Sequence, residues 1–488
     1  MFDLGYKEKV VVIGAGISGL ACAHRLKQLG FDPRLLEATE RAGGLIRTIR
    51  RDGFLFETGA QCPRFPPSVW ELVRDLRLEH EFVAGDPKAK RYVFRRGHLH
   101  PAPFSPMGLF TTRLVGLKSK LRILGEPFGY SHPPNQEESL ADFVQRKFGA
   151  QVLDNLVDPF ISTIFLGDSS KMGMESAFPA LVGWERRQGS LVRGALRARR
   201  SKRDAMKSGS SSPSLASRAD RSQGSLHVTD ALPTLGSFRS GMGTLPEKLA
   251  EELEAETTYN VQVASVAPSR ENAGASKPAW QISSTGGELI TAQYLVLAVP
   301  AYVAARLLER SAPPLAAHLK AIEYAPISVV SLAYERSKVA NRLDGFGFMV
   351  PRREGLHTIC TFWNSSLFKE RAPEGNVLFT SFAGRESNGA FGAMNDEECA
   401  RAVAAENSHI LEISSEPVAR LVWRDPHALP QYNVGHAQRV AEIHRILSQL
   451  PNLYLAGNFL RGRSIGDCVD VAYRVAEDLH SQIRGQDI

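Results

Sequence analysis

The sequence predicts an α/β fold with a discontinuous parallel-sheet domain, a mixed α+β domain and a helical domain. An apolar run at 10–13 leads into the turn Gly14-Ala15-Gly16-Ile17-Ser18-Gly19 and then into a helical pattern. A second apolar run, 33–36, ends at Glu37, and another strand–turn–helix pattern covers 452–479. Such βα units pair their strands in parallel. Because they occur at both ends of the chain, the sheet is predicted to combine distant segments.

The glycine turn has the pattern of a dinucleotide phosphate site. Gly14 permits a tight turn, Gly16 lets the backbone approach a pyrophosphate, and Gly19 lets the helix pack close to the strand. The helix N-terminus offers N–H groups and partial positive charge to phosphates. Glu37 follows the first glycine by about 20 residues, where a ribose needs a hydrogen-bond acceptor. An ordinary glycine-rich βα turn is the alternative.

The bulk composition excludes several classes of protein. The 488 residues are enough for two or three domains, and five scattered cysteines form no C-x-x-C pair. A reducing compartment is therefore favoured and a metal site is not expected. No signal peptide fits before the first strand, and no apolar run is long enough to span a membrane. The net charge of +7 is concentrated in 186–221, which argues against a basic body for nucleic acid.

Two segments raise the question of a membrane surface. Residues 101–129 are rich in apolar side chains with interspersed cations, a composition that fits an interfacial helix on an anionic bilayer or a half-buried helix at a domain boundary. Residues 197–228 are basic and of low complexity. They predict a mobile loop, either a solvated insertion or a membrane contact.

The domain boundaries follow from these patterns. Segments 1–62, 235–302 and 436–488 are assigned to the dinucleotide-binding domain, and 63–95 with 303–435 to a substrate-binding domain. Segment 96–234 is assigned to the helical domain. Strands are expected at Tyr259–Val266, Trp280–Ser284 and Tyr294–Val299, and a helix at Asp396–Ser414.

Two further motifs indicate which class of dinucleotide cofactor is bound. Glu37-Ala38 leads into Arg41 and the pair Gly43-Gly44, whose backbone N–H groups can close on phosphate oxygens. Near the end, Ala456-Gly457-Asn458 is followed by Gly466-Asp467 at the start of a helix. A helix N-terminus aimed at a flavin ring stabilises the reduced form.

Taken jointly, these motifs resemble those of the flavin amine oxidase superfamily. Three further segments, 165–179, 237–246 and 345–351, resemble the oxygen-dependent protoporphyrinogen oxidase family. The resemblance covers nearly the whole chain apart from the low-complexity insertion.

The resemblance implies an FAD enzyme that aromatises a porphyrinogen, with six electrons leaving in three hydride transfers to flavin N5 and oxygen as acceptor. No catalytic base is implied, so catalysis would rest on positioning. The cofactor residues it implies are Gly14, Ala15, Gly16, Ile17, Ser18, Gly19, Glu37, Ala38, Arg41, Gly43, Gly44, Gly59, Ala60, Val263, Arg463, Ser464, Ile465, Gly466 and Asp467. The substrate residues it implies are Arg91 for a propionate, Phe346 and Met349 as apolar walls, and Thr163.

The sequence departs from the family pattern at two positions. Thr163 stands where a glycine is common, and Gln61 where some relatives have a basic residue. Both departures concern substrate contacts, so coproporphyrinogen remains a second possible substrate. The pattern also leaves open an amine or polyamine oxidase, a carotenoid-type desaturase and a non-catalytic scaffold.

The remaining expectations concern partners and location. The protein is expected to be cytoplasmic, or peripheral on the inner face of a membrane. Handover of the product to the next haem-pathway enzyme and a homodimer are also left open.

Overall fold

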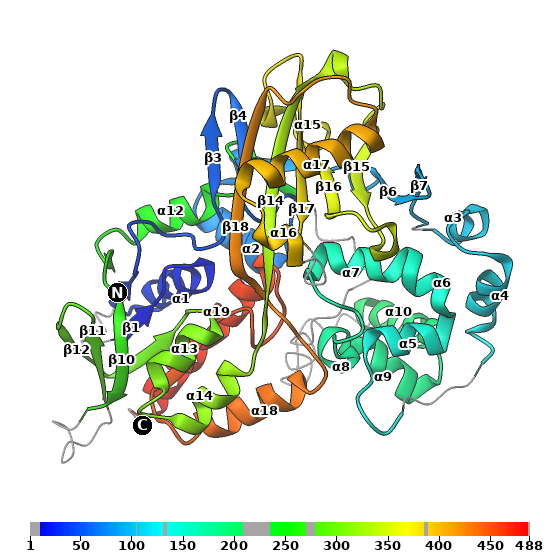
Figure 1. The fold of residues 1–488 in the computed structure, drawn as a ribbon. Helices are drawn as coiled ribbons and strands as arrows, with labels where there is room; N and C mark the ends of the chain where they lie inside the picture. Colours follow the sequence, from blue (N-terminus) through cyan, green and yellow to red (C-terminus); the bar gives the residue numbers. More distant parts are fainter. Residues whose placement is uncertain are drawn as a thin grey trace. The chain divides into compact units, whose positions relative to one another are not determined.

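The computed structural model describes residues 10–103, 105–129, 134–207, 235–269, 279–384 and 389–486, which form two compact units (Figure 1). The first unit comprises Met1–Gly85, Pro233–Tyr324 and Gln438–Ile488, and the second Asp86–Leu232 and Ala325–Ala437. The expected substrate-binding and helical segments thus share one unit. Segments 63–85 and 303–324, expected in the substrate-binding domain, lie in the first unit. One reason is that β5 (Phe82–Ala84) pairs with β8 (Gly236–Phe238).

A parallel five-stranded sheet forms the centre of the first unit. Its order is β19 (Leu453–Leu455), β13 (Tyr294–Leu297), β1 (Val10–Ile13), β2 (Pro33–Leu36) and β9 (Thr257–Thr258). All four residues of β1 are buried, as expected for a strand covered on both faces. Helix α1 (Ile17–Gln28) packs against α19 (Ile465–Gln486). The sheet therefore joins strands from the beginning, middle and end of the chain.

Smaller elements complete the first unit. They are the hairpin β3 (Thr48–Arg51) and β4 (Phe54–Glu57), the sheet β10 (Val263–Pro268), β11 (Trp280–Ser284) and β12 (Leu289–Ala292), and helices α2 (Pro67–Asp75), η1 (Glu79–Glu81), α12 (Thr244–Glu252), α13 (Ala301–Leu308), α14 (Pro313–Lys320) and most of α18 (His436–Leu447). Strand β10 begins later than the sequence predicts. Asn260 is left-handed with φ 59°, and the Val261 N–H donates to the Glu37 carbonyl instead.

A seven-stranded mixed sheet organises the second unit. Its order is β18 (Ala419–Pro430), β14 (Tyr324–Glu335), β17 (Asn376–Ala383), β16 (Thr358–Trp363), β15 (Gly345–Met349), β6 (Lys90–Arg95) and β7 (His98–Pro101). One face packs on α17 (Asp396–Leu411) through a core that includes Phe348, Phe379 and Val403. Helix α17 ends before the expected Ser414 because Glu412 turns left-handed. Short helices α15 (Asn364–Leu367), α16 (Gly389–Ala393), η3 (Arg336–Lys338), η4 (Arg352–Glu354) and η5 (Lys369–Arg371) join the strands.

The other face of this sheet meets a group of helices. They are α5 (Leu140–Phe148), α6 (Ala150–Val152), the π-helical η2 (Leu153–Val157), α7 (Asp158–Phe165), α8 (Met174–Ala177), α9 (Pro179–Gln188) and α10 (Leu191–Lys207). Residues 197–207 are therefore helical rather than a loop, and 208–228 lie outside the described residues.

The expectation of one helix over 101–129 is wrong. The segment forms α3 (Pro106–Thr111) and α4 (Leu117–Gly125), joined by a linker whose Leu114 and Val115 are 0% and 3% exposed. The Leu114 carbonyl accepts hydrogen bonds from Asn155 Nδ2 at 2.6 Å and Arg95 Nη1 at 2.8 Å. The linker breaks the helix because it is drawn into the core. No helix among the described residues is long and apolar enough to cross a membrane.

Candidate active site

The glycine turn between β1 and α1 leaves open space at the helix N-terminus. Gly14 has φ 101°, and its N–H donates to the Leu36 carbonyl at 2.8 Å. Gly16 is the N-cap of α1 and offers no side-chain hydrogen bond to the first turn, whose N–H groups have no partner within the helix. A Cβ built on Gly16 meets nothing within 4 Å. The turn is thus shaped as an anion-binding cradle.

Gly19 serves packing instead. A Cβ there would lie 1.8 Å from the Gly14 carbonyl oxygen and 3.2 Å from Ala298 Cβ. The helix approaches the turn and β13 as closely as it does only because this position has no side chain.

Glu37 is held in place by backbone and side-chain donors. Ala15 N–H donates to its Oε2 at 2.8 Å, and Thr39 donates to Oε1 from its N–H at 2.9 Å and its hydroxyl at 2.8 Å. The carboxylate is therefore fixed beside the glycine turn, at the end of β2. Carboxylate oxygens have further lone pairs, so these bonds leave capacity for ribose hydroxyls.

The Arg41 to Gly44 segment closes on the turn from the other side. Gly43 N–H donates to the Ala15 carbonyl at 2.8 Å. Arg41 donates to the carbonyls of Ala42 and Gly44 at 2.9 and 2.6 Å, so it orders its own loop. Burial, and then the neighbouring Arg47, lower the pKa of the Arg41 guanidinium. Two adjacent cations favour an anionic ligand here.

Gly59 and Ala60 follow the β3–β4 hairpin at half-buried positions. A Cβ on Gly59 would lie 2.9 Å from the Leu45 carbonyl oxygen. Gln61, the position that is basic in some relatives, is 4% exposed and donates to the Gly59 carbonyl at 2.8 Å. Its amide therefore stabilises the turn. Nearby, the buried Glu57 accepts from Thr48 Oγ1 and Met242 N–H, both at 2.8 Å.

The N-terminus of α19 carries its own cap. Asp467 Oδ2 accepts two hydrogen bonds from Ser464, one from the N–H at 3.0 Å and one from the hydroxyl at 2.6 Å. In return, Ser464 Oγ accepts from the Asp467 N–H at 3.1 Å. The Asp467 side chain thus serves the helix start. Ile465 and Gly466 are buried in the first turn, while Arg463 is half-buried before it. Val263, the first residue of β10, is buried at 5% exposure.

In the second unit, Arg91 begins a row of aromatic rings across the sheet. Its guanidinium carbon lies 4.6 Å from the centre of the Phe346 ring, within cation–π range. Phe346 contacts Phe362 at 5.9 Å between ring centres, and Phe362 contacts Phe382 at 5.2 Å. All three rings are half-buried. Gly347, directly opposite Arg91, has φ 136° and no room for a Cβ, which creates the bulge that projects Phe346.

The acid next to Arg91 is paired elsewhere. Asp344 accepts from Lys90 Nζ and from Tyr92 Oη, both at 2.6 Å. These hydrogen bonds, Lys90 first, lower the pKa of the Asp344 carboxyl. Asp344 is thus an ion-pair partner of Lys90.

Met349 faces the side of this sheet on which α7 packs, and Thr163 is a residue of α7. Met349 is 8% exposed and belongs to a core with Val93 and Cys360, against which Phe160, Phe362 and Phe382 pack. Thr163 on α7 donates its hydroxyl to the Pro159 carbonyl at 2.9 Å. Its half-buried side chain therefore already has a partner in its own helix.

Residues 17–480 match the family described as flavin containing amine oxidoreductase. The chain belongs to this family. It is an oxidoreductase whose cofactor is FAD, and the glycine turn, the fixed Glu37 and the open space at Gly16 fit that cofactor.

Two relatives and one solved structure are similar to this chain over nearly its whole length. A chloroplastic protoporphyrinogen oxidase from Nicotiana tabacum is 31% identical, covering 96% of this chain and 85% of the relative. A coproporphyrinogen III oxidase from Bacillus subtilis is 27% identical over 97% of this chain and 98% of its own. A crystal structure from Exiguobacterium sp. has a TM-score of 0.78 at 24% identity, covering 98% of this chain and 99% of that one. The resemblance to the protoporphyrinogen oxidase family is confirmed.

Sequence reasoning missed Phe362 and Phe382 in this flavoenzyme. Each stands in an apolar strand, and only the pairing of β15, β16 and β17 places Phe362 beside Phe346 and Phe382 beside Phe362. An aromatic residue at the same face of successive strands was the available signal.

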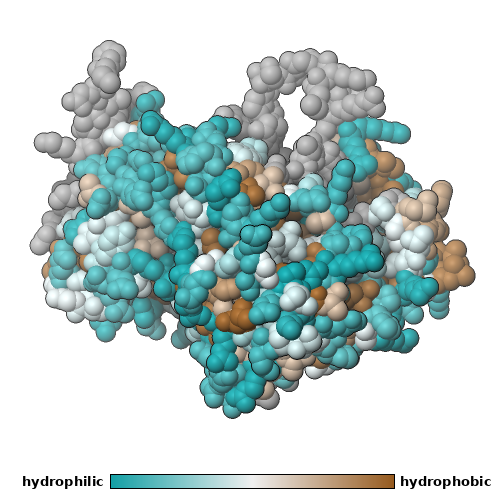
Figure 2. All heavy atoms as spheres, turned by 90° about the horizontal axis from the view of Figure 1, so that it is seen from above, coloured by the Kyte–Doolittle hydropathy of each residue, from teal (hydrophilic) through white to brown (hydrophobic). Residues whose placement is uncertain are grey.

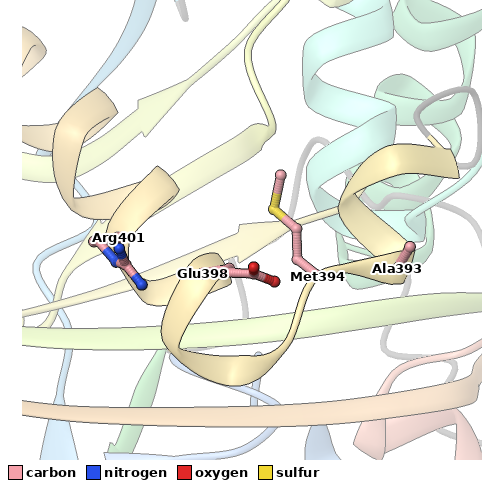
Figure 3. A pocket seen from close by; sticks show the side chains of 4 residues that line it. All are labelled: Ala393, Met394, Glu398 and Arg401. Atoms are coloured by element: carbon pink, nitrogen blue, oxygen red, sulfur yellow. The ribbon is translucent and has the colours of Figure 1, made fainter.

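A shallow pocket at the N-terminus of α17 is a different feature (Figure 3). It is lined by Ala393, Met394, Glu398 and Arg401. Glu398 forms a capping box with Asn395, accepting from its N–H at 2.8 Å and donating its own N–H to the Asn395 side chain at 2.9 Å. The acid therefore stabilises the helix start, and we assign the pocket no role.

Proposed function

We propose that this flavoenzyme oxidises protoporphyrinogen IX to protoporphyrin IX in haem biosynthesis, with oxygen as electron acceptor. The observation that carries the proposal is the row formed by Arg91, Phe346, Phe362 and Phe382. A cation at the end of a row of half-buried rings suits a flat tetrapyrrole that carries carboxylates. The relatives named protoporphyrinogen oxidase support the same substrate.

The cofactor would be held by the first unit. The first-turn N–H groups of α1, from Ile17 to Gly19, would face the diphosphate, and Glu37 would accept from ribose. Gly59, Ala60 and the first turn of α19 would meet the flavin end, through backbone groups in the case of Asp467. Val263 would meet the adenine end through its backbone. When bound, FAD supplies the hydride acceptor at N5.

The second unit would supply the substrate contacts. Arg91 would bind a propionate with charge-assisted hydrogen bonds. Phe346, Phe362, Met349 and the methyl of Thr163 would offer apolar contact. None of these side chains is a base, which suits a reaction in which pyrrole nitrogens lose their protons to solvent and the chain only positions the substrate.

Coproporphyrinogen III is the second candidate substrate. It undergoes the same chemistry, and a Bacillus relative carries its name. The two porphyrinogens differ in the number of peripheral carboxylates.

Anaerobic bleaching tests the proposed reaction. Purified yellow holoenzyme should lose its flavin absorbance with either porphyrinogen, and air should restore it together with red porphyrin fluorescence. Polyamines serve as the comparison substrates. Bleaching by an amine, with none by a porphyrinogen, would contradict the proposal.

The helical part of the second unit supports a peripheral membrane contact. Figure 2 shows hydrophobic atoms gathered at its right edge, the side on which Figure 1 draws α3 and α4. Exposed apolar side chains there are Met107, Phe110, Leu117, Leu121, Leu124 and Phe128. Exposed cations Arg113, Lys118 and Arg122 accompany them. Glu126 ties the end of α4 to α10 by accepting from Leu191 N–H at 2.6 Å.

We expect this surface to bind anionic lipid headgroups and to insert apolar side chains. The fraction of protein that sediments with phosphatidylglycerol vesicles should fall as the salt concentration rises. Leu121→Glu should lower this fraction further, whereas Leu289→Glu in the first unit should leave it unchanged. Equal recovery in the supernatant at every salt concentration would exclude this role. Product handover and a homodimer stay predictions from the resemblance.

A further inference from the structure

An apolar cavity of about 300 Å³ lies between the seven-stranded sheet and the helices of the second unit. Its walls come from β6, β15, α5, η2 and α7, among them Val93, Met349, Val144, Leu156 and Phe160. Every side chain that lines it is aliphatic, aromatic or methionine. It therefore offers no side-chain donor or cation to a carboxylate.

Val93 and Met349 connect the wall of the cavity with the proposed substrate surface. Val93 stands two residues after Arg91 on the same face of β6, about 7 Å along the strand. Met349 pairs directly with Val93 and shares a core with Phe160, Phe362 and Phe382. One apolar surface thus runs from the row of rings into the cavity, with Arg91 at its edge.

Three cations on the helices beside the cavity are already engaged. On α5, Lys147 Nζ lies 2.9 Å from Glu185 and 3.5 Å from Glu126, and Arg146 Nη1 lies 2.8 Å from Glu185. In η4, Arg352 pairs with Asp158 at 3.3 Å. A carboxylate that entered the cavity would lose its hydration without finding a free partner among these side chains.

We propose that this cavity receives the edge of the macrocycle that lacks carboxylates, and so selects protoporphyrinogen over coproporphyrinogen; this rests on the proposed function. In protoporphyrinogen IX the two propionates share one edge and the two vinyl groups occupy the opposite edge. In coproporphyrinogen III that opposite edge carries two further propionates. With Arg91 on one edge, the cavity accepts vinyl and methyl groups and rejects the additional carboxylates.

A substrate series on the unmodified holoenzyme tests the inference directly. We expect kcat/KM for protoporphyrinogen IX to exceed that for coproporphyrinogen III by roughly 100-fold, because two carboxylates would be desolvated. Mesoporphyrinogen IX, whose ethyl groups replace the vinyls, should lie within about threefold of protoporphyrinogen, since apolar groups are kept. Equal or greater activity with coproporphyrinogen overturns the inference but leaves porphyrinogen oxidation intact. Activity with none of the three contradicts the proposed function itself.

Charge variants at the half-buried Leu156 add a second test. The preference is the ratio of kcat/KM for protoporphyrinogen to kcat/KM for coproporphyrinogen. Leu156→Lys should lower this ratio at least about tenfold, because its ammonium can pair with an entering propionate. Leu156→Glu should not lower it, since it repels that propionate, and Leu156→Met should change it less than about threefold. Bound FAD absorbance checks that each variant is folded. If Lys and Glu shift the preference alike, the cavity does not select by charge; if a variant does not fold, the substrate series alone decides.

Discussion

Gly16 and Gly19 lie three residues apart in one turn, yet we expect their alanine variants to fail in different ways. In Gly19→Ala the new Cβ would stand 1.8 Å from the Gly14 carbonyl oxygen, a contact that only backbone movement can relieve. Overpacking of this kind costs up to about 3 kcal/mol, and alanine regains about 1 kcal/mol of helix propensity. The free energy of unfolding should therefore fall by about 2 kcal/mol.

Gly16→Ala is the matched variant. Its Cβ meets nothing within 4 Å, so the free energy of unfolding of the flavin-free protein should stay within about 0.5 kcal/mol of the original. The methyl would instead occupy the space in front of the first turn of α1. We expect FAD affinity to fall at least about tenfold, or about 1.4 kcal/mol.

Two measurements separate the variants. Denaturant unfolding of the flavin-free protein reports stability, and titration with FAD, followed by quenching of flavin fluorescence, reports affinity. If Gly19→Ala were as stable as the original, the close packing of α1 would not matter. If Gly16→Ala bound FAD normally, the open space at this turn would not be the diphosphate site.

Three further predictions concern other parts of the molecule. Arg91→Ala should raise KM for protoporphyrinogen about tenfold and lower kcat less, with Arg91→Lys intermediate; an unchanged KM in steady-state assays would remove Arg91 from substrate binding. Burial lowers the pKa values of His24 and His444 in the folded protein. The free energy of unfolding is therefore fully kept above about pH 6.5, and part of it is lost as the pH falls through the pKa values of the folded state. The denaturant midpoint should therefore drop on acidification, and His24→Gln should flatten that drop; an identical pH profile would speak against His24. Arg352→Ala removes the pair with Asp158 and the 2.8 Å bond to the Gly167 carbonyl, which should cost about 2 kcal/mol, less in Arg352→Lys; equal midpoints for all three proteins would show that the pair does not stabilise this loop.

Features set by neighbouring residues could be read from the sequence. The turn from Gly14 to Gly19 depends on backbone sterics within six positions, and the structure has the strand, turn and helix that the spacing predicts. Glu37 could be placed because it ends the next strand of the same βα unit. The flavin family could be recognised for the same reason, since its motifs are local.

Features set by distant residues could not be read in this way. The sequence pattern of 101–129 reads as one amphipathic segment, but Leu114 is buried because Asn155 and Arg95 bind its carbonyl. Tertiary hydrogen bonds therefore decide a placement that composition leaves open.

The sequence by itself determined the cofactor class, because a diphosphate is bound by a few consecutive backbone groups whose geometry glycine spacing dictates. Only the tertiary structure decided how Arg91, Phe346, Phe362 and Phe382 form one surface and how that surface continues into an apolar cavity. These residues come from four strands, of which β6 is far along the chain from the consecutive strands β15, β16 and β17. Their contact depends on strand order and register, which no local pattern encodes.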